Sequence, residues 1–253
     1  MTMTNTTSAS GKVAIITGAS RGIGAAIAQR LAADGMAVVV NYASRSDEAD
    51  ALVAKIVAGG GKAVAAKADV ADAAAVAALF DTAEAAFGKV DVLINNAGVM
   101  PAGLPMLADT DDASFDNIFD INVKGSFNTM RQAAKRLQHG GRIVNFSSSV
   151  VGLAMPGYSV YAASKSAIET MSNIFAKELR GKHITVNAIA PGPTATALFL
   201  NGKTEEVIER LSKAAPLERL GTPDDIAAAV AFLVSADGGW INGQTLRANG
   251  GII

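Results

Sequence analysis

The sequence predicts a doubly wound α/β domain whose mostly parallel, seven-stranded sheet carries helices on both faces. Three observations predict this class. Short β-branched runs recur along the chain, longer Ala-rich segments with helical spacing lie between them, and the first of these segments end near glycines. This alternation is typical of right-handed βαβ crossovers, which build a parallel sheet.

The expected strands are short and apolar, as strands buried on both faces should be. They cover 12–17, 37–42, 62–67, 90–94, 141–146, 183–189 and 244–248. Helices are expected between the first four strands, because apolar residues recur there at helical spacing and a glycine follows each segment. These helices cover 22–34, 46–59 and 72–87.

Later helices are expected at 112–138, 159–180 and 223–236. The last one opens with Thr222 as N-cap and a proline at the first helical position. One stretch, at about 191–216, has three prolines and a cluster of apolar residues, and fits neither pattern. We expect a substrate lid there, and a mobile surface loop is the alternative.

Composition and charge bound the function. Hydrophobic residues make up 50% of the 253 residues and charged residues 18%, which is typical of a globular protein with a sizeable core. Lys and Arg total 22 against 23 for Asp and Glu, and no dense basic run appears, so nucleic acid is not an expected partner. The chain has no cysteine, which excludes disulfides, thiolate nucleophiles and cysteine-ligated metal.

The chain ends and the apolar stretches suggest where the protein works. Residues 1–10 are small and polar, without the pattern of a secretory signal, and are expected to be a flexible tail before a single domain over 11–253. No apolar stretch approaches the roughly 20 residues that cross a bilayer. We therefore expect a cytoplasmic protein that does not enter membranes.

A glycine-rich loop follows the first strand. Val13 to Thr17 runs directly into Gly18-Ala-Ser-Arg-Gly-Ile-Gly24 at the start of an Ala-rich helix. Glycines permit a tight turn and a close approach to a pyrophosphate, while the free N–H groups at the helix start face the anion. The spacing differs from the commoner G-x-G-x-x-G, but the order of strand, loop and helix predicts a dinucleotide cofactor.

The end of the second strand predicts which cofactor is bound. An NAD site usually has an acid there to accept the ribose hydroxyls. Residues 41–45 contain none, and the first acid is Asp47. With Arg21 and Arg45 near, this favours NADP(H), with NAD(H) and two merely solvated arginines as the alternative.

Tyr161 and Lys165 lie four residues apart in an expected helix, on one face and roughly 6 Å apart at Cβ. An ammonium beside a phenol should lower the phenol pKa from about 10 and make it a better acid or base near neutral pH. The run Ser147–Ser149 follows the fifth strand, at the edge where open α/β sheets bind ligands. The glycine loop lies at that same edge.

Together these motifs resemble the short-chain dehydrogenase/reductase family, and within it the bacterial 3-oxoacyl-carrier-protein reductases. The matching residues run over nearly the whole chain. They are Thr17 to Gly24, Asp69-Val70, Asn95-Asn-Ala-Gly98, Asn122 in Asn-Val-Lys-Gly, Ser148, Tyr161-x-x-x-Lys165 and Pro191-Gly192.

The resemblance implies a Rossmann-like fold and four catalytic residues. Tyr161 would be the general acid in reduction and the general base in oxidation, and Ser148 would hydrogen-bond the substrate oxygen. Lys165 would lower the tyrosine pKa and bind the nicotinamide ribose. Asn122 would hold a water that links the lysine to solvent. No metal is implied.

The glycine loop and the resemblance together predict the cofactor contacts. They are Gly18, Ser20, Arg21, Gly22, Ile23, Gly24, Asn41, Tyr42, Ala43, Ser44, Asp69, Val70, Asn95, Ala97, Gly98, Tyr161, Lys165, Pro191, Gly192, Thr194 and Thr196. The implied function is that of an NADP(H)-dependent oxidoreductase that interconverts a ketone and a secondary alcohol. Alternatives are an NAD(H)-preferring alcohol or sugar dehydrogenase, and a non-catalytic nucleotide sensor.

The expected partner is a small carbonyl or alcohol substrate. Apolar residues in and near the expected lid suggest a pocket suited to a hydrophobic or aryl ketone. They are Leu153, Met155, Leu198, Phe199 and Leu200. Members of the resembled family usually assemble as tetramers, so a homotetramer is expected.

Overall fold

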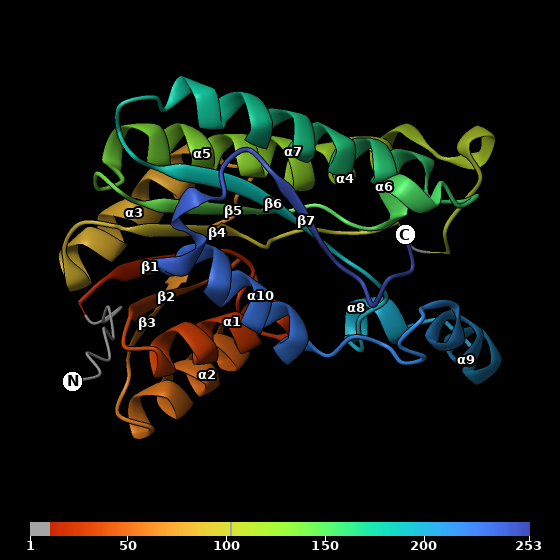
Figure 1. Cartoon of the computed structure of the whole chain (residues 1–253), viewed down its shortest axis with the longest axis horizontal. Coiled ribbons are helices and arrows are strands. Elements are labelled where there is room, and N and C mark those ends of the chain that lie inside the picture. The colour runs from red at the N-terminus through yellow and green to blue at the C-terminus, as the bar shows by residue number, and fades with distance from the viewer. Residues whose placement is uncertain (1–10, 102) are drawn as a thin grey trace, which may run out of the picture.

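The computed structural model describes residues 11–101 and 103–253, so the expected tail of residues 1–10 lies outside the described residues. Seven strands form one sheet in the order β3-β2-β1-β4-β5-β6-β7 (Figure 1). They are β1 (Val13–Ile16), β2 (Ala37–Tyr42), β3 (Lys62–Lys67), β4 (Val92–Asn95), β5 (Arg142–Phe146), β6 (Thr185–Pro191) and β7 (Thr245–Ala248). Each neighbouring pair is parallel, which confirms the predicted fold class.

Helices cover both faces of the sheet. In Figure 1, α1, α2 and α10 lie below it, and α3, α4, α5 and α7 lie above it. Their bounds are α1 (Gly22–Ala33), α2 (Ser46–Ala58), α3 (Ala73–Phe87), α4 (Asp112–Phe119), α5 (Gly125–Arg136), α7 (Ser159–Glu178) and α10 (Pro223–Val234). In the part of the chain that the structure describes, no helix is long and apolar enough to span a bilayer.

The strands alternate between two hydrophobic cores. In β1, Ala14 and Ile16 pack with α1 and α10, whereas Val13 and Ile15 pack with α3, α5 and α7. All four side chains are buried. A strand buried on both faces needs apolar residues at every position, which is why the predicted runs identified the strands.

The prediction of one continuous helix over 112–138 is wrong at its centre. A π-helical turn (Asp120–Lys124) separates α4 from α5. The turn carries Asn122, whose side chain is buried and bonded to Val99 and Ser164 outside the helix. Such single-turn π-bulges often occur at functional positions, because they redirect a side chain.

The residues between β6 and α10 form an excursion beyond the sheet, which we call the α8–α9 segment (192–221). It contains the helices α8 (Ala197–Leu200) and α9 (Glu205–Ala214), and α6 (Val150–Leu153) lies nearby, after β5 (Figure 1). The sequence predicted none of these short helices. The excursion as a whole was predicted, at about 191–216.

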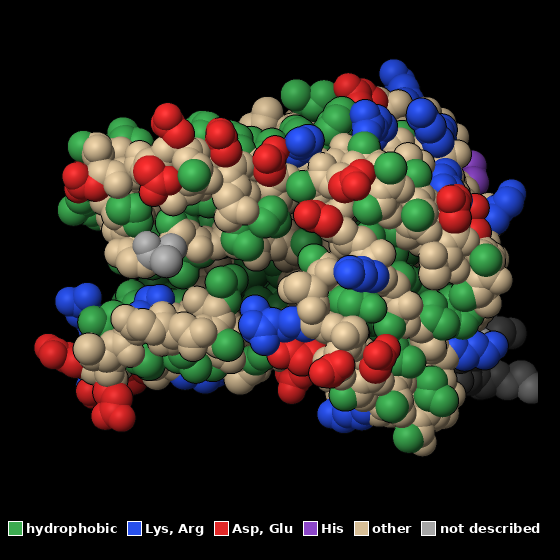
Figure 2. All heavy atoms as spheres, turned by 180° about the vertical axis from the view of Figure 1, so that it is seen from behind, with side chains coloured by type: hydrophobic (Ala, Val, Ile, Leu, Met, Phe, Trp, Pro, Cys, Tyr) green, Lys and Arg blue, Asp and Glu red, His purple; other side chains and the backbone are tan. Residues whose placement is uncertain are grey.

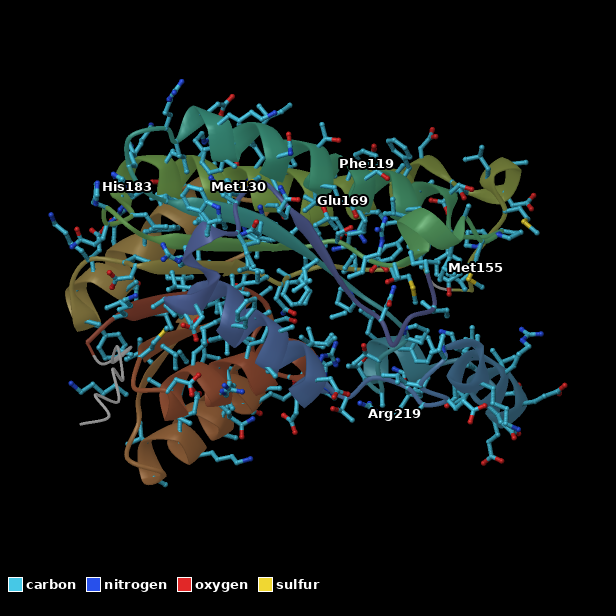
Figure 3. All side chains as sticks on the ribbon, viewed as in Figure 1. Phe119, Met130, Met155, Glu169, His183 and Arg219 are labelled. Carbon is cyan, nitrogen blue, oxygen red and sulfur yellow. The ribbon has the colours of Figure 1, made fainter. Side chains whose placement is uncertain are left out.

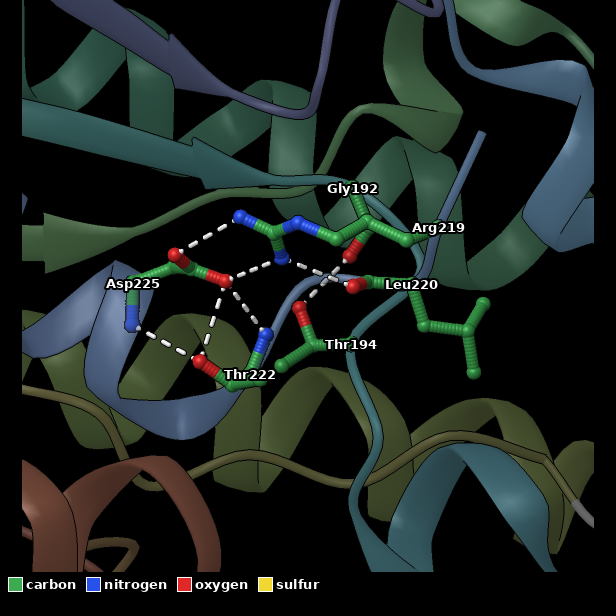
Figure 4. A network of polar contacts seen from close by, with 6 residues as sticks. All are labelled: Gly192, Thr194, Arg219, Leu220, Thr222 and Asp225. Atoms are coloured by element: carbon green, nitrogen blue, oxygen red, sulfur yellow. Dashed lines mark hydrogen bonds and ion pairs between the residues drawn. The ribbon is translucent and has the colours of Figure 1, made fainter. Parts of the chain in front are cut away.

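The two ends of the α8–α9 segment are joined at its base. The Ala195 N–H donates to the Gly221 carbonyl at 2.8 Å, and the Gly221 N–H donates to the Pro193 carbonyl at 2.9 Å. Beside this bridge, Arg219 pairs with Asp225, which also accepts from Thr222 at the start of α10 (Figure 4). The segment therefore leaves and rejoins the body of the protein at one place.

Candidate active site

Two adjoining cavities open at the carboxyl ends of the strands. The larger one, with about 1180 Å³ of empty volume, lies over the glycine loop, and the smaller one, with about 960 Å³, lies over β5 and α7. Figure 2 shows the molecule hollowed beside the lobe that carries α8 and α9. Because both cavities share lining residues, they form one continuous cleft. The shared residues are Ile23, Asn96, Gly98, Thr196 and Leu198.

The glycine loop leaves its backbone open to the larger cavity. Gly18 and Gly22 have positive φ angles of 59° and 57°, a conformation that side chains disfavour. A Cβ on Gly24 would lie 2.6 Å from the Asn96 amide nitrogen and from the Gly18 carbonyl. Asn41 accepts a 3.2 Å bond from the Gly18 N–H and so holds the loop from below. This cradle, bounded by backbone and a helix start, fits a dinucleotide pyrophosphate.

The end of β2 forms another wall of the larger cavity. Tyr42, Ala43 and Ser44 line it, as predicted, and no acid occurs among them. Arg45 also lines it, but its guanidinium donates to the Glu48 carboxylate at 2.9 Å. Arg21 lines the cavity and has no ion-pair partner among the described residues, so it is the arginine better placed to meet a 2′-phosphate.

Asn95, predicted to contact the cofactor, does not line either cavity. Its side chain is buried between the sheet and α5, where it donates to Asn145 of β5 at 2.8 Å and accepts from Thr129 of α5 at 2.7 Å. Its neighbour Asn96 lines both cavities and donates to the Thr17 and Gly18 carbonyls at 2.9 Å. Strand alternation could have identified Asn96, since side chains at neighbouring positions point opposite ways.

The other predicted cofactor contacts line one or both cavities. Those at the larger cavity include Asp69 and Val70 after β3, and those at the smaller one include Pro191 at the end of β6 and Gly192 and Thr194 after it. Segments far apart in sequence are thus gathered at one edge of the sheet.

Ser148, Tyr161 and Lys165 meet in the smaller cavity. The Ser148 hydroxyl lies close enough to the Tyr161 phenol to lower its pKa, and the Lys165 ammonium lies 5.7 Å from the centre of the Tyr161 ring. Lys165 also donates a 2.9 Å bond to the Phe146 carbonyl.

The expected lowering of the tyrosine pKa is wrong in this structure. Burial raises the pKa of Tyr161 to about 12, and the nearby Ser148 hydroxyl opposes that rise only in part. Burial also lowers the pKa of Lys165 to about 8. Desolvation is the largest cause of both shifts, because burial disfavours the charged form of each group. The phenol is therefore protonated at neutral pH, which suits a proton donor.

The neighbours of Ser148 are occupied elsewhere. Ser147 donates to the Glu169 carboxylate at 2.6 Å, and Ser149 donates to the Ala190 carbonyl at 3.1 Å. Of the three serines predicted at this edge, Ser148 is therefore the one whose hydroxyl meets Tyr161.

Asn122 lies behind the cleft rather than in its lining. Its amide oxygen accepts from the Val99 N–H at 2.8 Å, and its nitrogen donates to the Val99 carbonyl and to Ser164, both at 3.0 Å. A Cβ on Gly98 would lie 3.2 Å from both the Asn122 oxygen and the Lys165 nitrogen. The amide and the ammonium therefore both pack closely against that glycine.

The outer part of the smaller cavity is apolar. Its ionisable lining side chains, within the described residues, are Tyr158, Tyr161 and Lys165. Of the apolar residues expected to line a pocket, Leu200 does not contribute. Met155 follows α6 (Figure 3), and Leu211 of α9 was missed by the sequence. The apolar lining consists of Met100, Val150, Leu153, Met155, Leu198, Phe199 and Leu211, together with Ile23, Phe146 and the prolines Pro191 and Pro193.

Comparison with known proteins relates this chain to a large group of proteins. A family model described as "Enoyl-(Acyl carrier protein) reductase" matches residues 18–253. A "Short-chain type dehydrogenase/reductase" from Picea abies is 48% identical over 250 residues, which cover 95% of this chain and 92% of the relative. A "NADPH-dependent aldehyde reductase-like protein, chloroplastic" from Arabidopsis thaliana is 42% identical over 255 residues, which cover 96% and 94%.

Solved structures share the fold over nearly their whole length. A short chain dehydrogenase from Burkholderia cenocepacia J2315, solved in complex with NADP, has a TM-score of 0.91 and 40% identity. A blue fluorescent protein from a metagenomic library, solved in complex with NADPH, has a TM-score of 0.91 and 38% identity. In both, the match covers 97% of this chain and 99% of the other.

Proposed function

The chain belongs to the short-chain dehydrogenase/reductase family, and from that premise we propose that it is an NADP(H)-dependent oxidoreductase that interconverts a ketone and a secondary alcohol. One observation carries the proposal. A single cleft joins the glycine-loop cradle to a cavity that contains Ser148, Tyr161 and Lys165. A bound nucleotide and a proton donor would therefore act on the same substrate carbonyl group, the nucleotide on its carbon and the proton donor on its oxygen.

The cofactor is NADP(H). Arg21 faces the larger cavity, and the wall formed by Tyr42, Ala43 and Ser44 contains no carboxylate that would repel a 2′-phosphate. Relatives named as NADPH-dependent, and solved structures in complex with NADP or NADPH, support the same choice. The residues that would hold the cofactor are the predicted contacts without Asn95, with Asn96 added.

The side chains supply the proton chemistry of carbonyl reduction. When bound, NADPH supplies the hydride that adds to the carbonyl carbon. Tyr161 donates its phenol proton to the carbonyl oxygen, and Ser148 donates a hydrogen bond to that oxygen as negative charge develops. The Lys165 ammonium stabilises the phenolate left behind. Asn122 positions the backbone beside the lysine, and solvent returns the proton to Tyr161.

The proposal is tested by NADPH oxidation with a panel of carbonyl compounds. Because the matched family model is described by enoyl reduction, the panel includes an enoyl thioester beside the ketones and aldehydes. We expect turnover with ketones, and its loss in Tyr161→Phe with NADPH affinity nearly unchanged. A Tyr161→Phe variant that retains a tenth of wild-type turnover would remove the tyrosine from the mechanism. If the enoyl thioester were the only compound reduced, the assignment as a carbonyl reductase would be wrong and enoyl reduction would take its place.

The substrate lid at about 191–216 belongs to this proposal. Thr196 and Leu198 line both cavities, so this part of the α8–α9 segment would contact cofactor and substrate together. If the α8–α9 segment closes over cofactor and substrate, proteolytic cleavage within 197–214 should become slower. Cleavage at the same rate with NADP⁺ and an alcohol product present would contradict a lid.

A homotetramer of single-domain subunits in the cytoplasm is proposed from the family. Large exposed apolar side chains would supply contacts between subunits if they gather at an interface. Phe115 and Phe127 lie on α4 and α5, and Trp240, which is 98% exposed, precedes the edge strand β7 in the chain. Light scattering would give the mass, and a monomer would contradict this assembly.

A further inference from the structure

Tyr158 has a buried ring and a hydroxyl without a protein partner. It lines the smaller cavity, and only 8% of its surface is exposed. None of the described residues forms a hydrogen bond with its phenol oxygen, yet that oxygen is not sealed from solvent. Buried tyrosine hydroxyls usually find a partner. The Tyr158 hydroxyl is therefore available to form a hydrogen bond with a molecule in the cavity.

The other polar side chains around the cavity already use their donor hydrogens in bonds to protein acceptors. Within the described residues, Tyr158 is thus the polar lining side chain outside the catalytic group whose donor hydrogen has no protein acceptor. The paired residues are Asn96, which bonds the Thr17 and Gly18 carbonyls; Ser147, which bonds Glu169; Ser149, which bonds the Ala190 carbonyl; Thr194, which bonds the Gly192 carbonyl; and Thr196, which bonds the Thr194 carbonyl and the Phe199 N–H.

The position of Tyr158 is fixed close to the reacting group. Its ring centre lies 6.4 Å from that of Tyr161, and it is near enough to contribute to the raised pKa of Tyr161. Its backbone N–H donates to the Met155 carbonyl, and a Cβ on the preceding Gly157 would lie 2.6 Å from the Leu104 carbonyl. The backbone here is closely packed, so the phenol is held in place before a ligand arrives.

The residues that line the smaller cavity restrict the chemical class of ligand that it can bind. Apart from Lys165, no charged side chain lines the smaller cavity among the described residues, so a carboxylate or phosphate on the substrate would be desolvated without a partner. Apolar surface makes up the rest of the outer wall. A neutral phenol can donate to a carbonyl and accept from a hydroxyl.

We propose that Tyr158 is a substrate-binding residue and that the substrate is an uncharged, apolar carbonyl compound with a second oxygen function, a hydroxyl or a carbonyl. The Tyr158 phenol hydrogen-bonds that second oxygen while Ser148 and Tyr161 engage the reacting one. This inference rests on the proposed function and adds the substrate class.

The test compares substrates that differ in the second oxygen. Acetophenone has the reacting carbonyl alone, whereas the three ring-hydroxylated acetophenones and 1-phenylpropane-1,2-dione add a hydroxyl or a carbonyl. For each we take the ratio of its kcat/KM to that of acetophenone. In Tyr158→Phe, at least one of these ratios should fall about fivefold or more. Ratios that all stay within twofold of wild type would overturn the proposal.

A control removes a hydroxyl elsewhere on the same helix. Thr170→Val lies on α7 at an exposed position outside the cavity lining, so it should leave every ratio unchanged. A fall in both variants would mean a general effect on α7 and would count against Tyr158. A thermal melt confirms that Tyr158→Phe is folded.

Calorimetric titration of the same probes into the NADP⁺-loaded protein separates this inference from the proposed function. A weaker Kd for a hydroxylated probe in Tyr158→Phe, without NADPH oxidation by wild type, would leave Tyr158 as a binding residue and refute the oxidoreductase. If wild type turns over the probes but Tyr158→Phe leaves the kcat/KM ratios and the affinities unchanged, the oxidoreductase function would stand and the role of Tyr158 in substrate binding would be refuted. Failure of every probe to bind wild type at millimolar concentration would refute the substrate class.

Discussion

The Ser147 hydroxyl donates a 2.6 Å hydrogen bond to the Glu169 carboxylate, and this bond joins the end of β5 to α7. Ser147 precedes Ser148, and Glu169 lies one helical turn beyond Lys165, so the bond couples the two elements that present these groups. Figure 3 labels Glu169 on α7. Glu169 is a positioning residue in this arrangement, because it touches neither cavity. The sequence motifs gave no signal for it.

Glu169→Ala should lower kcat about tenfold and the free energy of unfolding by about 2 kcal/mol, because a charge-assisted hydrogen bond is lost and Ser147 keeps only its long, 3.5 Å bond to the Lys165 carbonyl. Glu169→Gln keeps an acceptor and should recover most of both. Exposed Glu178 at the end of α7 provides the matched control, Glu178→Ala. Wild-type kcat in Glu169→Ala would show that the bond does not position the site.

Lys165 should make stability depend on pH. Its pKa falls from 10.5 to about 8 on folding, so between these values the unfolded chain binds more protons than the folded one. Stability from this group therefore rises with pH, by about 2 to 3 kcal/mol between pH 8 and 10. The raised pKa of Tyr161 acts later, since its contribution is lost only from pH 10 towards 12.

Urea unfolding of wild type and Lys165→Met across pH 7 to 10 measures that contribution. The variant should be the more stable protein at pH 7, because it buries no charge there, and its advantage should shrink by about 2 to 3 kcal/mol at pH 10. A difference between the two proteins that does not change with pH would contradict the lowered lysine pKa.

Arg21→Ala should raise the KM for NADPH about tenfold and that for NADH less than twofold, because the guanidinium would contact only the 2′-phosphate. Arg45→Ala is the comparison, and its effect should be smaller because Glu48 already pairs with Arg45. Steady-state kinetics with both cofactors decides this. An unchanged KM for NADPH in Arg21→Ala would refute the assignment.

Gly24→Ala should weaken NADPH binding at least tenfold and cost about 1 to 3 kcal/mol of stability. The new methyl group would lie 2.6 Å from the Gly18 carbonyl, so the cradle would have to shift. Gly59→Ala is a matched control at the end of α2, where the nearest atom is 3.4 Å away and φ is −80°. Fluorescence titration with NADPH should separate them, and equal affinities would count against the cradle.

The parallel sheet could be predicted from sequence because its strands and the helices between them are recognisable from local sequence patterns. Buried parallel strands appear as apolar runs, and glycines such as Gly59 and Gly88 mark helix ends. The π-helical turn could not be predicted, because it depends on bonds from Asn122 to Val99 and Ser164, which are distant in sequence.

The gathering of Ser148, Tyr161 and Lys165 was predictable from their spacing and from the resemblance they support. The direction of the tyrosine pKa was not, because spacing reveals the nearby ammonium but not how completely both groups are buried. The exchange of Asn95 for Asn96 has a simpler cause. The strand continues to Asn95, and its alternation turns that side chain toward α5 and away from the cleft.

The bridge between Ala195, Gly221 and Pro193 has a consequence for evolution and engineering. Since both ends of the α8–α9 segment are fastened to each other, the stretch between them can be transplanted from one relative into another as a cassette, with its length and residues changed, while the seven strands keep their register. Diversity in what these proteins accept can accumulate there without eroding the scaffold that holds the nucleotide.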